Sequence, residues 1–196
     1  MQDKKAEIFN SGREVFYSKG FKNTNVSDIT KAAGMAVGTF YNYYSSKEQL
    51  FIEIFIKENE NLKKNIMNAV DITGHPAKVI KEIVALNLSG TNSNPILREW
   101  YNTELISKLE REFYKQGGME SIYELMNSAT IELLNKWRAE GKIRIDLDDE
   151  FILAIFKAIP YIDLHKEDIG IEHFPKIMDY ITEFIMQGLT DNSKKK

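Results

Sequence analysis

Residues 20–51 read GFKNTNVSDITKAAGMAVGTFYNYYSSKEQLF and contain two short amphipathic segments separated by Gly34. We expect the first segment to form a helix over about 26–33, because cap-forming side chains precede it and a glycine follows it. We expect the second to form a helix of about two turns over 37–43. Two short helices joined through a glycine predict a helix-turn-helix motif, which we place at residues 25–44.

The surface of the second helix of this pair is chemically mixed. Residues 37–44 combine small, hydroxyl, amide and aromatic side chains, which suit close approach to DNA phosphates and base edges. A bulky side chain at Gly38 would hold the helix away from the bases. Phe40 and Tyr44 should point into the core of a three-helix head, while Lys47 opens the next helix beside the presumed DNA backbone.

The rest of the chain is also helical, because apolar residues recur at helical spacing and no hairpin signal appears. We therefore expect an all-α fold of about nine helices. The boundary between two functional parts falls inside the fourth helix, which predicts a DNA-binding domain over 1–48 and a regulatory, ligand-binding and dimerisation domain over 49–196. The expected helices are 3–19, 26–33, 37–43, 46–70, 77–89, 95–117, 120–140, 149–164 and 175–187.

Composition narrows the function classes. The net charge is −3, yet residues 1–50 carry seven Lys and Arg against five Asp and Glu. A mildly basic head on an acidic body suits a DNA-reading module attached to a second domain. The absence of cysteine excludes disulfides and thiolate chemistry. With no long apolar run and no secretion signal at the N-terminus, the sequence predicts a cytoplasmic protein without a membrane partner.

The quoted stretch resembles the N-terminal domain of the TetR family of repressors. The resemblance rests on residues in fixed order over about 30 positions, namely Gly20, Phe21, Thr24, Asp28, Ile29, Ala33, Gly34, Gly38, Thr39, Tyr41, Ser46, Lys47, Glu48 and Leu50. It implies a regulator that binds a palindromic duplex operator as a homodimer and is released by a small molecule. It covers only the first quarter of the chain.

The resemblance also implies a set of DNA contacts. Phosphate contacts are expected from Thr24, Thr39, Tyr41 and Lys47, and base contacts from Val37, Gly38, Asn42 and Tyr43. Either Thr24 or Asn25 is expected to be the N-cap of the first helix, and Asn25 completes the DNA-binding set. Ala36 stands where the family often has Ser, so a side-chain cap is lost there.

Aromatic and Met side chains in the second domain predict a site for a small hydrophobic or amphipathic effector. The candidates are Trp100, Tyr101, Phe113, Met126, Trp137 and Phe156. Each of them taken alone is better explained as ordinary core. Their number in one helical domain is what favours a binding interior.

The last two helices carry apolar residues on more than one side, which predicts that they pair with a second copy in a four-helix bundle. The candidate interface residues are Ile152, Ala154, Ile155, Ala158, Ile181, Phe184 and Ile185. The alternative is that both helices only close the core of a single chain.

Two rival functions remain. An enzyme is disfavoured, because the sequence has no serine-hydrolase, phosphate-loop or zinc-protease motif. Three scattered histidines give no metal site, and no cofactor is expected. A helical adaptor or small-molecule-binding protein without DNA binding stays open as the alternative.

Overall fold

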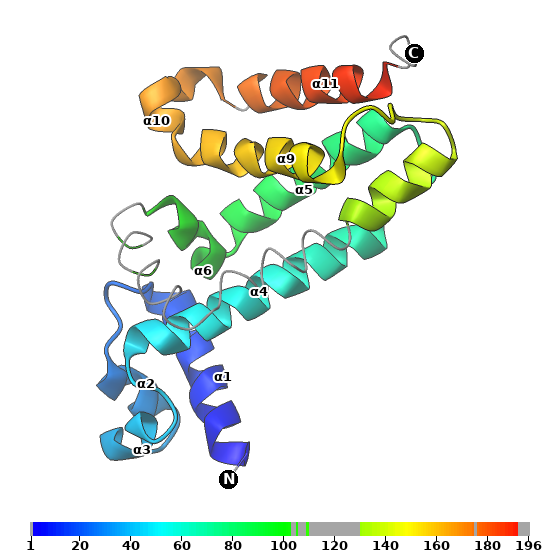
Figure 1. Ribbon diagram of the computed structural model, residues 1–196. Helices are drawn as coiled ribbons and strands as arrows, with labels where there is room; N and C mark the ends of the chain where they lie inside the picture. The colour runs from blue at the N-terminus through cyan, green and yellow to red at the C-terminus, as the bar shows by residue number, and fades with distance from the viewer. Residues whose placement is uncertain (1, 103–104, 106–108, 110–129, 175, 192–196) are drawn as a thin grey trace. The chain divides into compact units, whose positions relative to one another are not determined.

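The computed structural model describes residues 2–102, 105, 109, 130–174 and 176–191. Within these residues the only regular elements are helices, and no strand occurs, which confirms the predicted all-α fold (Figure 1). The chain packs as two units. Unit 1 comprises residues 1–65 and 87–122, and unit 2 comprises residues 66–86 and 123–196.

The predicted division at residue 48 differs from this packing. Helices α4 and α5 each contribute to both units, and residues 87–102 pack with the N-terminal head. The division at 48 concerns function and stays a prediction. Unit 1 contains α1 Gln2–Lys19, α2 Val26–Ala32, α3 Val37–Tyr41, the first part of α4 Lys47–Ala69, the end of α5 Pro76–Ser93, α6 Pro95–Arg98 and the 3-10 turn Glu99–Tyr101.

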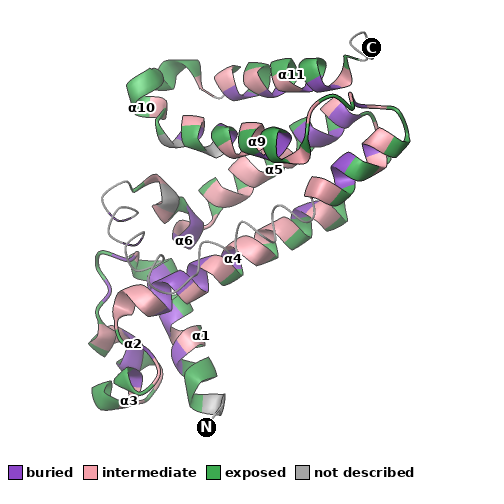
Figure 2. Ribbon diagram, in the orientation of Figure 1, coloured by how far each residue is buried: buried purple, intermediate pink, exposed green. Residues whose placement is uncertain are grey.

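The core of unit 1 is aromatic and centres on α1 and α4. The Phe16 and Phe51 rings meet edge to face with centroids 5.1 Å apart, and Phe21 lies 4.9 Å from Phe51. Phe40 and Tyr44 are at most 1% exposed, which confirms their predicted core positions. The α3 helix is therefore anchored through one buried face and leaves its other face outside (Figure 2).

Two glycines in the head have identifiable structural reasons. A Cβ at Gly12 would lie 2.6 Å from Cδ2 of Leu50, so a glycine here allows α1 and α4 to cross closely. Gly34 has φ of 64°, a left-handed conformation that favours glycine after a helix end. Gly34 thereby ends α2 and redirects the chain into α3, as predicted.

Unit 2 contains the end of α4, the start of α5, a helix over residues 130–139, α9 Asp149–Leu164, α10 Lys166–Ile169, the 3-10 turn Ile171–His173 and α11 Lys176–Thr190. Helices α9 and α11 run antiparallel and pack against each other (Figure 1). The interior is formed by fully or nearly fully buried side chains, namely Leu134, Trp137, Ile143, Ile152, Met178, Met186 and Leu189.

Three predicted helix ends were wrong by three residues or more. The helix expected over 77–89 continues to Ser93. The helix expected over 95–117 ends at Arg98 and gives way to a 3-10 turn. The Oδ1 of Asn102 then accepts from the backbone N–H of Leu105 at 3.1 Å, the capping geometry that starts a new turn. The last helix continues past Gly188 to Thr190, because a glycine inside a helix costs stability without forcing an end.

Candidate nucleic-acid interface

The first helix of the pair begins with a capping box. Oδ1 of Asn25 accepts from the N–H of Asp28 at 2.8 Å, and the Asp28 carboxylate accepts from the N–H of Asn25 at 3.0 Å. The Asn25 backbone N–H and the ammonium of Lys19 hold the pKa of Asp28 below its ordinary value. Asn25 is thus the N-cap, and its side-chain oxygen is committed to the start of α2.

The structure gives the Thr24 side chain a different role from the predicted phosphate contact. Its side chain is 2% exposed, and its hydroxyl donates to the carbonyl oxygen of Gly20 at 2.7 Å. A buried hydroxyl whose proton is already donated is placed to close the α1–α2 turn. The predicted phosphate contact through the Thr24 side chain is therefore replaced by a structural role in the turn.

Lys47 lies against the same turn from the side of α4. Its ammonium donates to the carbonyl oxygens of Phe21, at 2.9 Å, and of Thr24, at 2.6 Å. The same ammonium lies 4.1 Å from the centroid of the Phe21 ring, within the range of a cation–π contact. Lys47 thereby fixes the turn that precedes α2, in addition to the phosphate contact expected of it.

The exposed face of α3 brings together several of the predicted contact residues. Val37 is 43% exposed and Tyr41 is 56% exposed, while Gly38 and Asn42 are also exposed. A Cβ at Gly38 would meet no atom within 4 Å. The chain itself therefore gives no packing reason for a glycine here, and the small residue leaves space for an external surface.

The other two predicted contacts on this segment are less accessible. Thr39 is half-buried on α3, and Tyr43 follows the helix and packs partly against the core. Ala36 provides no side-chain hydrogen bond at the N-cap of α3, as expected from its identity. The exposed face is thus narrower than the sequence predicted.

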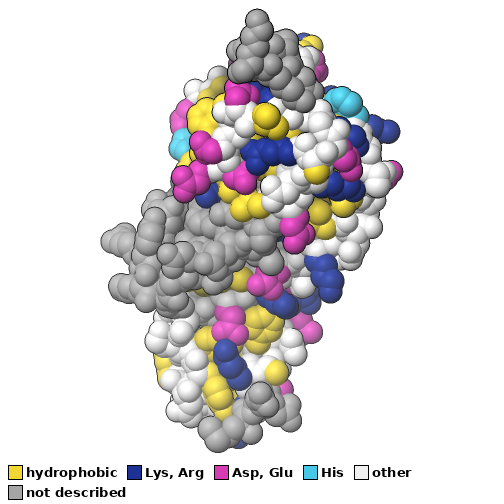
Figure 3. Space-filling model, turned by 45° about the vertical axis from the view of Figure 1, so that its right-hand side comes forward, with side chains coloured by type: hydrophobic (Ala, Val, Ile, Leu, Met, Phe, Trp, Pro, Cys, Tyr) yellow, Lys and Arg dark blue, Asp and Glu magenta, His cyan; other side chains and the backbone are white. Residues whose placement is uncertain are grey.

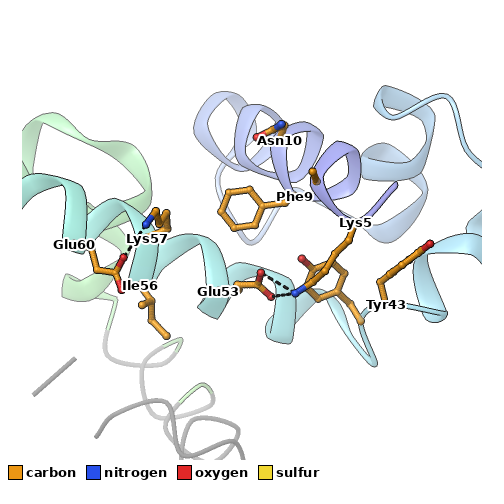
Figure 4. A pocket seen from close by; sticks show the side chains of 10 residues that line it. Lys5, Phe9, Asn10, Tyr43, Glu53, Ile56, Lys57 and Glu60 are labelled. Atoms are coloured by element: carbon orange, nitrogen blue, oxygen red, sulfur yellow. Dashed lines mark hydrogen bonds and ion pairs between the residues drawn. The ribbon is translucent and has the colours of Figure 1, made fainter. Parts of the chain in front are cut away.

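A surface cavity of about 730 Å³ lies behind Tyr43, between α1 and α4 (Figure 4). The ammonium of Lys5 donates to both carboxylate oxygens of Glu53 at 3.0 Å and lies 5.2 Å from the centroid of the Tyr44 ring. Burial, with Glu53 nearby, raises the pKa of the Tyr44 hydroxyl. The three predicted effector residues whose side chains the structure describes, Tyr101, Trp137 and Phe156, do not line this cavity.

Basic residues around the helix pair fall into two groups. Lys5, Arg13 and Lys19 form ion pairs within the head. Lys22, in the turn before α2, and Lys31, on α2, are exposed and form no ion pair with a described residue. Sequence reasoning missed these two lysines, although their position beside the motif was visible. They are available to DNA phosphates.

Charge elsewhere is mixed. On the face drawn in Figure 3, Lys and Arg side chains of the described residues are interspersed with Asp and Glu side chains. In the part of the chain that the structure describes, no group of three or more His, Asp or Glu could hold a metal ion. No described helix has the length and apolar character needed to cross a membrane.

The predicted effector residues are not gathered into one described site. Phe113 and Met126 lie outside the described residues, as does the side chain of Trp100. Tyr101 belongs to unit 1, whereas Trp137 and Phe156 belong to unit 2. Trp137 is fully buried, and its indole Nε1 has no hydrogen-bond partner among the described residues.

The predicted dimer residues divide into two kinds. Ile152 is fully buried within unit 2 and faces its own core, so its placement at an interface was wrong. The remaining six are at least partly exposed on α9 and α11: Ala154, Ile155, Ala158, Ile181, Phe184 and Ile185. Large exposed apolar side chains accompany them, namely Phe151, Tyr161 and Tyr180.

Comparison with known proteins assigns the head to a recognisable group. The sequence model of the tetR family, described as bacterial regulatory proteins, matches residues 8–54. The chain is 34% identical over 83 residues to the uncharacterized HTH-type transcriptional regulator YerO of Bacillus subtilis, covering 41% of this chain and 28% of YerO. It is 26% identical over 174 residues to the HTH-type transcriptional regulator UidR of Escherichia coli, covering 87% and 86%.

The extent of these matches differs along the chain. For YerO and two Mycobacterium tuberculosis regulators, the chain spans 28% to 48% of the relative's length. Among solved structures, FadR of Thermus thermophilus, a TetR-family transcriptional repressor in complex with lauroyl-CoA, matches with a TM-score of 0.65. The identity is 20%, and the alignment covers 93% of this chain and 91% of FadR. At that identity, the match shows the fold alone.

Proposed function

We propose that this chain is a TetR-type regulator that represses transcription by binding a palindromic operator as a homodimer, and the match of the tetR family model to residues 8–54 and the similarity to UidR support this. The observation that carries the proposal is the exposed face of α3. Val37, Tyr41 and Asn42 surround a glycine with no neighbouring atom at its Cβ position, and Phe40 anchors the opposite face. A helix built this way can enter the major groove without a bulky side chain holding it away.

The proposed contact set combines residues that the family resemblance implies with two further exposed lysines. Tyr41, Thr39 and Lys47 contact phosphates, while Val37, Asn42 and Tyr43 lie nearest the base edges. Lys22 and Lys31 add phosphate contacts at the turn before α2 and on α2 itself. Phosphate contacts set the register of the protein on the duplex, and base contacts set its sequence preference.

We propose that α9 and α11 form the homodimer interface. Phe151, Ala154, Ala158 and Tyr161 recur at helical spacing along α9 and are exposed. On α11, the Tyr180 and Phe184 rings lie 5.9 Å apart, and Phe184 is 62% exposed. Contiguous exposed apolar side chains of this size favour burial against a partner. A second copy is the occupant, because a twofold pair of heads fits a palindrome.

We propose that an amphipathic small molecule is the effector, and two polar residues one turn apart on α4, Asn59 and Lys63, support this. Lys63 is half-buried, and its desolvation lowers its pKa to about 8. One turn earlier, the buried Oδ1 of Asn59 has no hydrogen-bond partner among the described residues. The neighbouring Glu58 carboxylate already accepts from Arg13 and Asn94. An effector with an acidic or hydroxyl group would satisfy this pair.

A mobility-shift titration tests the proposal. The probe is the duplex upstream of the protein's own coding sequence, with an unrelated duplex of equal length as the control. We expect a shift of the upstream duplex at a protein concentration that leaves the control unbound. An adaptor without sequence-specific DNA binding predicts either no shift of the two duplexes or an equal, salt-sensitive shift of both. Either result would refute the proposal.

A further inference from the structure

The α1–α2 turn is held from outside the helix-turn-helix motif by a residue 78 positions later in the chain. The backbone N–H of Phe21 donates to Oε1 of Glu99 at 3.1 Å. This carboxylate oxygen also lies 3.4 Å from the Cβ position of Gly20, whose φ is 74°. The carboxylate thus approaches the turn at Gly20 and Phe21, and Gly20 leaves room for it because it has no side chain.

Glu99 is itself fixed in place. It begins the 3-10 turn Glu99–Tyr101 directly after α6, a helix that packs against α1. The side chain of Asn94 caps α6 by accepting from the N–H of Ile96 at 2.9 Å. The Nδ2 of Asn102 donates to the second carboxylate oxygen of Glu99 at 3.3 Å. Both carboxylate oxygens therefore have partners, and the side chain is oriented before it meets the turn.

Phe21 is the point on which these contacts converge. Its N–H is bound by Glu99, its carbonyl oxygen by Lys47, and its ring lies under the Lys47 ammonium. The side chain is 6% exposed and packs on Phe51. An anion bound to its N–H and a cation bound to its carbonyl oxygen restrain the two peptide groups that flank Phe21. Charged partners make each of these hydrogen bonds stronger than a neutral one.

We propose that Glu99 is a positioning residue for DNA binding. Its carboxylate holds the α1–α2 turn, and the turn sets where α2 begins and where Lys22 and Lys47 meet phosphates. The part of this inference that concerns DNA affinity rests on the proposed function. The hydrogen bond to Phe21 can be tested without DNA.

Electrostatics and positioning predict opposite results for this residue. A carboxylate near DNA repels phosphates, so charge alone predicts tighter binding when Glu99 is neutralised. Positioning predicts that Glu99→Ala binds more weakly, because the Phe21 N–H loses its partner. Glu99→Gln keeps an oxygen acceptor, so it should bind as tightly as the wild type or more tightly.

The experiment has two arms on the full chain. In the first, amide hydrogen exchange of residues 20–24 is followed without DNA. We expect exchange about tenfold faster in Glu99→Ala and within about threefold of wild type in Glu99→Gln, the size of one hydrogen bond. Glu82→Ala, at an exposed carboxylate of α5, is the control and should change nothing.

The second arm measures affinity for a duplex obtained by selection from a random pool. We expect Glu99→Ala to lose about tenfold, with Glu99→Gln rescued. Equal affinities of the two variants, or unchanged exchange in Glu99→Ala, would overturn the proposal. If Glu99→Ala unfolds, Asn102→Ala serves instead and should show the same changes at smaller size. A wild type that selects no DNA refutes the proposed function, while the exchange arm still decides the role of Glu99.

Discussion

The DNA-binding head and the α9–α11 pair of unit 2 expose different kinds of surface. In the head, Phe40 and Tyr44 are buried, and the exposed side of α3 is built around Gly38 with one large aromatic, Tyr41. In unit 2, α9 and α11 bury Ile152 and Met186 but leave several large apolar side chains outside. The first surface suits a polar, grooved partner, and the second suits an apolar one. This difference is why we propose DNA as the partner of the first surface and a second copy of the chain as the partner of the second.

The largest effect is expected from breaking the apolar surface. Phe184→Glu places a charge where 62% of the side chain is exposed, so the fold of unit 2 should persist. The homodimer should dissociate, and operator affinity should fall by at least about 100-fold because one head cannot span two half-sites. Sedimentation velocity measures whether the homodimer dissociates, and circular dichroism measures whether the helical fold persists. Asn68→Glu, an exposed charge on α4, is the control. A persisting dimer would contradict the assignment.

The second effect tests the open surface of α3. Gly38→Leu should keep or raise the thermal unfolding midpoint, because no atom of the described residues lies within 4 Å of the new Cβ and leucine favours a helix more than glycine does. Operator affinity should fall about 100-fold, since the side chain occupies space proposed for DNA. Asn68→Leu adds the same side chain at an exposed position outside the head. Retained affinity in Gly38→Leu would separate α3 from the DNA.

The third effect concerns the charge of Lys63 on α4. Burial lowers the pKa of Lys63 to about 8, below its ordinary 10.5, so the folded state binds this proton less well than the unfolded state. Below pH 8 the cost of burying the charge is present in full, and it disappears as the pH rises to about 10.5. Lys63→Met should therefore stabilise the protein at pH 7 by up to about 3 kcal/mol, and by much less at pH 10.

Urea unfolding of wild type and Lys63→Met at the two pH values measures this difference. Lys64→Met, one position along α4 and exposed, is the control for the substitution itself. An equal effect of Lys63→Met at both pH values would show that the pKa of Lys63 is not lowered. Asn59 and Lys63 would then lose their support as effector contacts.

The smallest effect separates two roles of Lys47. Removing its hydrogen bonds to two carbonyl oxygens should cost about 1–3 kcal/mol of stability. Removing a phosphate contact should also lower the salt slope of operator binding by about one. Lys47→Ala is expected to show both, whereas Lys31→Ala should lower the slope without a stability loss. If Lys47→Ala kept the wild-type salt slope of operator binding, Lys47 would have only its structural role in the turn.

The sequence predicts the head well because its signals are local. Gly34 ends α2, Asn25 caps it, and Phe40 is buried, each for a reason visible within a few residues. The role of Thr24 was misassigned because its hydroxyl partner, the Gly20 carbonyl, depends on how the turn closes. Glu99 could not be found at all, since its partner Phe21 is distant in sequence.

The second unit is harder to predict for a related reason. The helical spacing of α9 and α11 shows that both sides are apolar, but spacing alone does not tell which side faces the chain's own core. Ile152 and Ile155 read alike in the sequence, and the structure buries only the first completely. The effector residues depend on long-range packing in the same way, which is why they did not converge on one described site.

The central claim is that this chain reads a palindromic duplex through α3. Selection of bound sequences from a random duplex pool tests it most directly, with Gly38→Leu run in parallel. The account predicts that the wild type enriches an inverted repeat whose half-sites are about one helical turn apart, roughly 34 Å, and that Gly38→Leu enriches none. Enrichment of no sequence by the wild type, or of the same repeat by both proteins, would contradict it.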